Sequence, residues 1–118
     1  MKEGEFLIGS DVLRGYNDTI LLHILADGDS YGYELSKEIA QRSGDIYIIK
    51  ETTLYSAIAR LEKNGHVSSY IGEKTYGKQR TYYTITEIGR QYYKEKCAEW
   101  HETKQLMKNF TIGENVNE

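Results

Sequence analysis

Two groups of polar side chains near the middle of the chain have the chemistry needed to bind phosphates and base edges. The first group consists of Thr52, Thr53, Tyr55, Ser56, Arg60 and Lys63. The second group consists of Lys74, Lys78, Gln79 and Arg80. Hydroxyl, amide and cationic side chains of these types make the contacts between proteins and nucleic acids. The residue types therefore predict a surface that binds a polyanion.

A regular apolar spacing places the first group on a helix. The spacing is i, i+3, i+4 and i+7, and the residues are Leu54, Ala57, Ile58 and Leu61. At about 100° per residue, Thr52, Ser56 and Lys63 point away from this stripe. Tyr55 points sideways, where packing and a phosphate contact are both open. Gly65 is expected to end the helix.

The second group falls on a predicted hairpin. Residues 66–71 and 80–85 are rich in β-branched and aromatic side chains, and the loop GEKTYGKQ separates them. Lys74 and Lys78 then lie at the tip, and Arg80 lies beside it. A helix followed by such a hairpin is the order found in a winged helix-turn-helix, whose wing suits a phosphate backbone or a minor groove.

The distribution of charge along the chain agrees with this order. Residues 50–80 hold six Lys and Arg residues and three Glu residues, so this segment is +3 in a chain of net charge −3, and the remainder is −6. A basic segment on an acidic body orients a protein on DNA and limits non-specific binding elsewhere. The alternative is an ordinary solvated charged surface.

The elements before this segment are predicted from caps and periodicity. Ser10 and Asp11 are candidate caps for a first helix, whose apolar positions repeat from Leu13 to Leu25. Ser30 can cap a second helix that Gly44 closes. The β-branched residues 46–49 are expected to form a short third strand beside the wing.

A long helix is predicted from Thr86, as N-cap, to about Asn109. Its apolar stripe consists of Tyr93, Cys97, Trp100, Met107 and Phe110. A stripe that contains an exposed tryptophan is unsatisfied in a monomer, so we expect a symmetric dimer. The expected divisions are an N-terminal arm (1–9), a winged helix-turn-helix DNA-binding domain (10–85), a dimerisation helix (86–110) and a disordered tail (111–118). The predicted fold class is mainly α with a small β-hairpin wing.

Several other classes of protein are not expected. No apolar run approaches the ~18 residues that a membrane helix requires, and the N-terminus lacks the apolar region of a signal peptide, so we expect a cytoplasmic protein with no membrane partner. Cys97 and the three histidines show no metal-ligand spacing, and we expect neither metal nor cofactor. No nucleophile elbow or phosphate loop indicates an enzyme. His101 beside Trp100 as a catalytic base is a weak alternative.

Three motifs follow one another along the chain: DTILLHILADGDSYGYEL (18–35), TTLYSAIARLEKNGHVSSY (52–70) and GKQRTYYTITEIG (77–89). Together they resemble the PadR family of bacterial transcriptional regulators, in particular a short subfamily similar to LmrR-like multidrug regulators. The resemblance implies a homodimeric repressor that binds a roughly palindromic operator, with one helix per protomer in a major groove and half-sites one turn, ~34 Å, apart. It assigns DNA contacts to Thr52, Thr53, Tyr55, Ser56 and Arg60 in the helix. In the wing it assigns them to Lys74, Lys78, Gln79 and Arg80.

The resemblance also implies an effector site. In similar family members a tryptophan that matches Trp100 lines a cavity between protomers and stacks on flat aromatic ligands. Residues expected at this site or at the dimer interface are Trp100, Tyr93, Cys97, Lys104, Met107, Val12, Tyr16 and Thr19. Lys104 lies one turn beyond Trp100, with Glu99 and Glu102 on the flanks, so we expect a neutral or anionic aromatic effector. The equally weighted alternative is that Trp100 only packs the dimer interface.

Other interpretations of these residues stay open. Thr52 and Thr53 could cap their helix, and Arg60 could pair with Glu51, Glu62 or a neighbouring helix. The whole domain could instead be a winged-helix protein-interaction module without DNA binding, because a fold does not fix a function.

Overall fold

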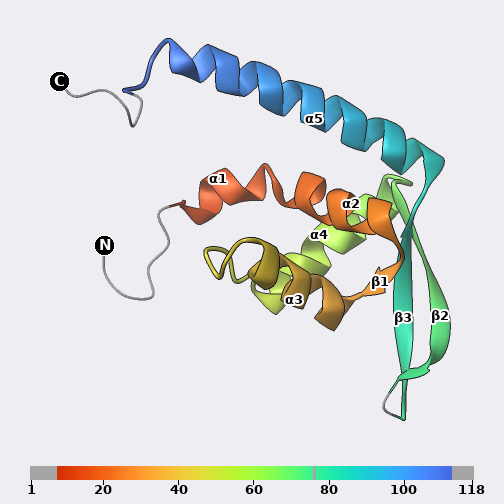
Figure 1. Cartoon of the computed structure of the whole chain (residues 1–118). Coiled ribbons are helices and arrows are strands. Elements are labelled where there is room, and N and C mark those ends of the chain that lie inside the picture. The colour runs from red at the N-terminus through yellow and green to blue at the C-terminus, as the bar shows by residue number, and fades with distance from the viewer. Residues whose placement is uncertain (1–7, 76, 113–118) are drawn as a thin grey trace.

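The computed structural model describes residues 8–75 and 77–112. Its elements are α1 (Ser10–Arg14), α2 (Asn17–Asp27), β1 (Ser30–Tyr31), α3 (Gly32–Arg42), α4 (Glu51–Lys63), β2 (Val67–Thr75), β3 (Lys78–Ile85) and α5 (Glu87–Lys108). Figure 1 shows α1 to α4 packed together, the β2–β3 hairpin projecting from them, and α5 running back alongside α1 and α2. The predicted fold class, mainly α with a small antiparallel wing, is confirmed.

The core lies between α2, α3 and α4. The predicted stripe of α4 is confirmed, because Leu54, Ala57, Ile58 and Leu61 are all buried. They pack with leucines of α2 and with Leu35 of α3. Gly65 adopts a positive φ of 79° just beyond the helix, and its N–H bonds the carbonyl oxygen of Glu62. A left-handed residue after the last turn is a common way to end a helix.

The predicted first helix is wrong in one respect: it is broken into α1 and α2. The N–H groups of Gly15 and Tyr16 bond the carbonyl oxygens of Val12 and Leu13 at 3.1 and 2.8 Å, which tightens the chain into a three-residue turn. Glycine has a low helix propensity, so the helical pattern is easily interrupted at Gly15. Ser10 lies inside α1, and Gly9 occupies the position of the cap.

The third strand was also predicted in the wrong place. It is β1, which pairs antiparallel with β3 through Ser30 opposite Tyr83 and Tyr31 opposite Tyr82. The sheet order is therefore β1-β3-β2. Residues 46–49 form an irregular link instead, because Gly44 and Asp45 both have positive φ and turn the chain so that only Ile49 of this segment is buried in the core. Ser30 does not cap α3; its hydroxyl donates to Glu34 at 2.6 Å.

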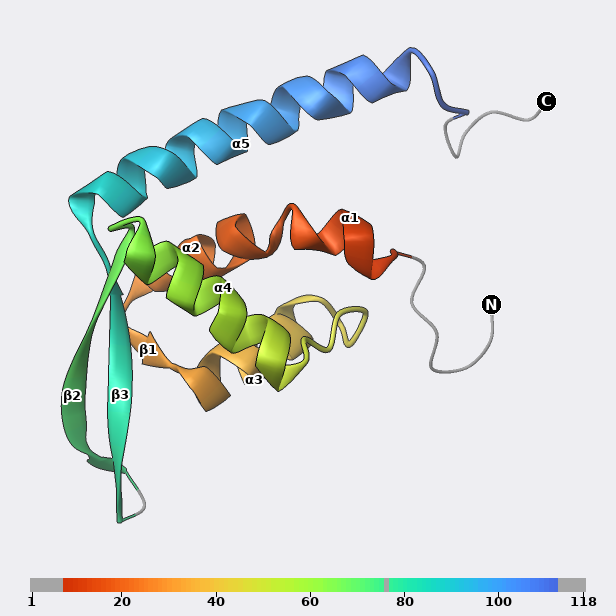
Figure 2. The ribbon, with the colours of Figure 1, turned by 180° about the vertical axis from the view of Figure 1, so that it is seen from behind.

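The start of α5 is joined to the turn between α4 and β2. Thr86 is the N-cap, as predicted: its hydroxyl accepts the N–H of Gly89 at 3.0 Å and donates to the carbonyl of Gly65 at 2.7 Å. Figure 2 shows that the far half of α5 extends past α2 along α1. Most of the expected arm (1–9) and tail (111–118) lies outside the described residues.

Candidate nucleic-acid interface and the cavity beside Trp100

The outward face of α4 carries the predicted polar group. Thr52, Ser56 and Lys63 are exposed, and Thr53 is half-buried. Neither threonine caps the helix, because the cap position is Lys50 and no side chain bonds the free N–H groups there. Thr53 and Lys50 instead line a hollow of about 330 Å³ together with α1. Their side chains and the unpaired N–H groups of this helix end can serve a phosphate.

Arg60 is held by a neighbouring helix. Its guanidinium makes two hydrogen bonds to the carboxylate of Asp18 in α2, one of them from Nε at 3.3 Å. These bonds raise the pKa of Arg60. Of the partners considered from the sequence, the neighbouring helix is therefore the one observed. A bidentate Arg–carboxylate pair fixes the side chain, so Arg60 anchors α4 to α2.

Tyr55 lies across the start of α3. A Cβ atom at Gly32 would come within 2.0 Å of the Tyr55 hydroxyl, so glycine is needed for this close approach. The ring stays partly exposed and borders a hollow of about 250 Å³ together with Tyr33 and Ser36. The sequence patterns did not identify Tyr33, which is 64% exposed and lines the same hollow. The only signal was the tyrosine-rich YGY run after the DGDS turn.

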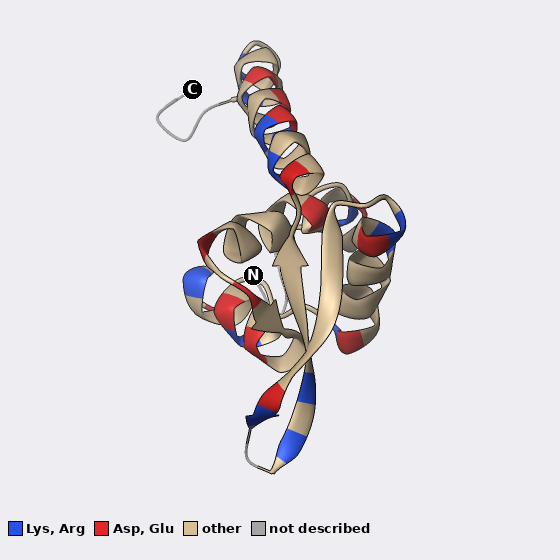
Figure 3. Cartoon of the chain, turned by 90° about the vertical axis from the view of Figure 1, so that its right-hand side faces the viewer, with Lys and Arg blue, Asp and Glu red and all other residues tan. Residues whose placement is uncertain are grey.

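The cationic side chains of the wing differ in how far they are exposed. Lys74, Lys78 and Gln79 are exposed near its tip, with Lys74 opposite Gln79 in the strand pairing. Figure 3 shows blue Lys and Arg segments gathered toward the end of the hairpin, with acidic colour beside them. Arg80 is different because it is half-buried, and its guanidinium carbon stands 5.0 Å from the centre of the Tyr31 ring. This is a cation–π contact at the base of the wing.

The base of the wing is also bonded to the turn before β1. The hydroxyl of Tyr70 in β2 donates to Asp29 at 2.6 Å. Hydrogen bonds from Tyr70 and then Thr84 lower the pKa of Asp29 below its ordinary value of 3.8. Hydrogen bonds to a carboxylate favour its ionised form.

This contact predicts a pH dependence of stability. Because the pKa of Asp29 is lower in the folded chain, its stabilising contribution is present above pH 3.8 and is lost as the pH falls through the folded pKa. The difference in free energy of unfolding between wild type and Asp29→Asn should be constant near neutrality and shrink below pH 3.8. Urea unfolding at a series of pH values measures it. A difference that stays constant down to strongly acidic pH would contradict the prediction.

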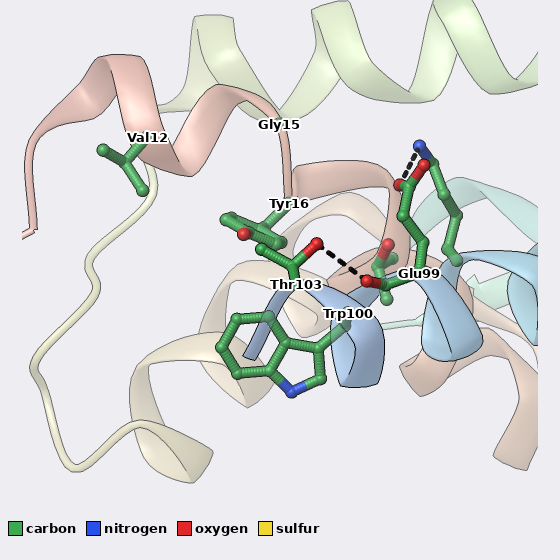
Figure 4. A pocket seen from close by; sticks show the side chains of 8 residues that line it. Val12, Gly15, Tyr16, Glu99, Trp100 and Thr103 are labelled. Carbon is green, nitrogen blue, oxygen red and sulfur yellow. Dashed lines mark hydrogen bonds and ion pairs between the residues drawn. The ribbon is translucent and has the colours of Figure 1, made fainter. Parts of the chain in front are cut away.

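A cavity of about 420 Å³ lies between α5 and the α1–α2 region (Figure 4). It is lined by Val12, Gly15, Tyr16, Thr19, Lys96, Glu99, Trp100 and Thr103. The Tyr16 and Trp100 rings meet edge to face, with centres 5.7 Å apart. Trp100 is 45% exposed, so part of its indole surface is accessible. Four residues expected together from the sequence, Val12, Tyr16, Thr19 and Trp100, are thus neighbours.

The charges at this cavity differ from those expected. Lys104 does not line it, whereas Lys96 and Glu99 do, and they form an ion pair at 3.0 Å. Lys96 lies one turn before Trp100 on α5, whereas Lys104 lies one turn beyond it and is exposed outside the lining of the cavity. The expected influence of Lys104 on a bound ligand therefore has no support from its position.

The remaining members of the expected set lie elsewhere. Tyr93 packs against the core, with its hydroxyl oxygen 2.6 Å from Nδ1 of His23. Burial, and then a hydrogen bond with Cys97, raise the pKa of Tyr93. Tyr93 also borders a largely apolar hollow of about 540 Å³ between α2 and α3. Met107 is exposed farther along α5.

Within the described ranges, no group of three or more His, Cys, Asp and Glu side chains could hold a metal ion. No helix in the same ranges is long and apolar enough to cross a membrane. His101, the weak candidate for a catalytic base, is exposed on α5.

The architecture is that of a winged-helix regulator: a polar recognition helix, a basic wing and a long final helix. Residues 21–95 match the transcriptional regulator PadR-like family, and the chain belongs to that family. A transcriptional regulator from Clostridium thermocellum is 57% identical over 90% of this chain and all of its own, with a TM-score of 0.83. A PadR family transcription regulator from Clostridium difficile is 33% identical over 80% of this chain and 97% of its own, with a TM-score of 0.71.

A protein from Lysinibacillus sphaericus, named only as uncharacterised, is 40% identical over 107 residues, which cover 91% of this chain and 98% of that protein. The family is one of transcription regulators and not of enzymes. Its members' role as DNA-binding regulators agrees with the polar face of α4 and the basic wing.

Proposed function

We propose that the protein is a homodimeric repressor that binds a roughly palindromic operator and is released by a small aromatic ligand. The short subfamily similar to LmrR-like multidrug regulators is the nearest functional analogy. The observation that carries the proposal is the exposed hydroxyl face of α4 followed by a wing with Lys74 and Lys78 near its tip. Such a protein would act in the cytoplasm, where it meets chromosomal DNA.

In this proposal α4 enters the major groove and presents Thr52, Thr53 and Ser56 to base edges and phosphates. Tyr55 and Lys63 contact the flanking backbone. The wing presents Lys74, Lys78, Gln79 and Arg80 to the phosphates beside the groove. Arg60 serves by holding α4 against Asp18, so that its contribution to DNA binding is through the position of the helix.

The exposed end of α5 supports dimerisation through residues 86–110, with residues 10–85 as the DNA-binding domain. Trp100, Leu106, Met107 and Phe110 are large apolar side chains with substantial exposure along or just beyond this helix. The apolar hollow between α2 and α3 offers further surface for a second copy. A two-fold dimer buries such surfaces and sets two recognition helices at one spacing. Sedimentation velocity of the intact protein tests the dimer.

The test of DNA binding is a gel shift and footprint on DNA upstream of the protein's own gene. Wild type should protect a two-part site, and Thr53→Ala and Arg80→Ala should each weaken binding. The alternative function, a protein-interaction module, predicts no protection. It also predicts that any association survives neutralisation of Lys78 and Arg80 and depends little on salt.

The cavity beside Trp100 supports an aromatic effector. Its volume of about 420 Å³ lies within the range of small-molecule sites. The accessible indole and the Tyr16 ring offer rigid apolar faces to a planar molecule. Because Lys96 and Glu99 pair with each other, the lining carries little net charge, and a neutral ligand suits it best. To release DNA, the ligand must bind the DNA-free conformation more tightly than the DNA-bound one.

This effector model predicts the outcome of a fluorescence titration. Trp100 is the only tryptophan in the chain, so quenching reports on this cavity alone. Neutral planar aromatic compounds should quench it at lower concentrations than matched cations, and Tyr16→Ala should weaken the effect. Anisotropy of a labelled operator should then fall at saturating ligand. An unchanged dissociation constant for the operator would count against release by ligand.

A further inference from the structure

Three tyrosine rings form a continuous series across the base of the wing. Tyr70 in β2 stacks on Tyr82 in β3, with ring centres 5.8 Å apart and planes inclined by 19°. Tyr82 in turn meets Tyr31 in β1 at 5.3 Å in an edge-on arrangement. Gly72 leaves the room for this series, because a Cβ atom there would lie 2.2 Å from the Tyr82 ring. The rings therefore join all three strands on one face of the sheet.

Both ends of this series are fixed by polar groups. At one end the Tyr70 hydroxyl donates to Asp29 at 2.6 Å, in the turn just before β1. At the other end the Arg80 guanidinium covers the Tyr31 ring at 5.0 Å. The buried Nε of Arg80 has no hydrogen-bond partner among the described residues, and the guanidinium lies against the Tyr31 ring. Arg80 is thus oriented by an aromatic face.

The series leads directly to the recognition helix. Tyr31 is followed by Gly32, the first residue of α3, and Tyr55 of α4 lies over Gly32. Figure 1 shows β1 between the helices and the hairpin, so this short strand is one of the connections between them. A two-residue strand has few backbone hydrogen bonds, and an isolated two-stranded hairpin is at best marginally stable in water. Side-chain contacts of this strand therefore add to the connection that Val67, Tyr83 and Ile85 make by packing in the core.

We propose that Asp29, Tyr70, Tyr82, Tyr31 and Arg80 form a wing brace that fixes the angle of the β2–β3 hairpin relative to α4. The inference rests on the proposed function as a DNA-binding regulator. In it, Tyr70 and Asp29 are positioning residues: they need not touch DNA, yet they hold the wing where its cations meet the backbone beside the groove that α4 enters. Fixing the wing before binding removes an ordering cost from the complex.

The test uses Tyr70→Phe in the full-length protein, which keeps the stacked ring and removes only the bond to Asp29. The dissociation constant for the operator should rise about five-fold, the effect of removing one hydrogen bond. The slope of log K against log salt should stay unchanged, because the phosphate contacts are the same in number. Tyr92→Phe, a matched change on α5, should leave the affinity at the wild-type value.

Amide hydrogen exchange gives a second readout that needs no DNA. In Tyr70→Phe, exchange at residues 30–31 and 82–83, where β1 pairs with β3, should quicken while α4 stays protected. Wild-type operator affinity in Tyr70→Phe overturns the brace as a positioning device. If the wild-type protein binds no DNA, the proposed function fails. Unchanged amide exchange in Tyr70→Phe would then overturn the brace as well. Faster exchange in Tyr70→Phe would retain the brace as a device that fixes the wing.

Discussion

Replacing Gly89 by alanine should lower the free energy of unfolding by about 2 kcal/mol, within the range for overpacking a close contact. A Cβ atom at this buried position would lie 2.0 Å from the backbone oxygen of His66 and 2.9 Å from Ile85. A backbone oxygen cannot rotate away as a flexible side chain can. The start of α5 must therefore separate from the turn after α4. Alanine's gain in helix propensity, ~1 kcal/mol, is too small to offset this.

Urea unfolding of the purified variant measures the effect. Gln91→Ala, at an exposed position two residues along the same helix, is the matched control and should change stability by less than about 0.5 kcal/mol. Equal stabilities for Gly89→Ala and wild type would contradict the close contact. His66 also stacks on Tyr92 of α5, with ring centres 4.1 Å apart.

The double variant Lys74→Ala with Lys78→Ala should bind the operator at least ten-fold more weakly near physiological salt. Both side chains are exposed near the tip of the wing, where the proposal places the DNA backbone. Each lysine that binds a phosphate adds about 0.9 to the slope of log K against log salt. The double variant should therefore show a shallower slope, by about 0.9 for each phosphate that it no longer neutralises, as well as weaker binding.

A control with the same change in net charge separates local contacts from general electrostatics. Lys94→Ala with Lys108→Ala removes two exposed cations from α5, away from the wing. This pair should leave the salt slope at the wild-type value. If both double variants weaken binding equally, the wing does not contact the phosphates.

Regular periodicity and local caps account for the parts of the fold that could be predicted. The stripe around Leu54 and Leu61, the cap at Thr86 and the extent of α5 are each encoded within a few neighbouring residues. The short strand was misplaced because residues 46–49 have strand composition but no partner. Residues 30–31 gain theirs from β3, more than fifty positions away. Pairing of this kind depends on tertiary structure and leaves no local signal.

The candidate sites likewise contain parts that local sequence patterns predict and parts that depend on tertiary structure. The exposed positions of α4 and the wing followed from helix and strand periods, and so did the presence of Trp100 on an unfilled face. The pairing of Arg60 with Asp18, 42 positions away, depends on how two helices cross. The packing of α5 against α1 and α2 likewise decides that Lys96 and not Lys104 lines the cavity. The series of tyrosines across the wing depends on the register between the strands, which local sequence patterns do not reveal.

Footprinting combined with fluorescence anisotropy on DNA upstream of the protein's own gene tests the central claim most directly. The account predicts two protected half-sites one helical turn, ~34 Å, apart and binding at least about 1,000-fold tighter than to a random duplex of equal length at the same salt. Equal affinity for the upstream and random duplexes, with no protected site, would contradict the account of this protein as a sequence-reading regulator.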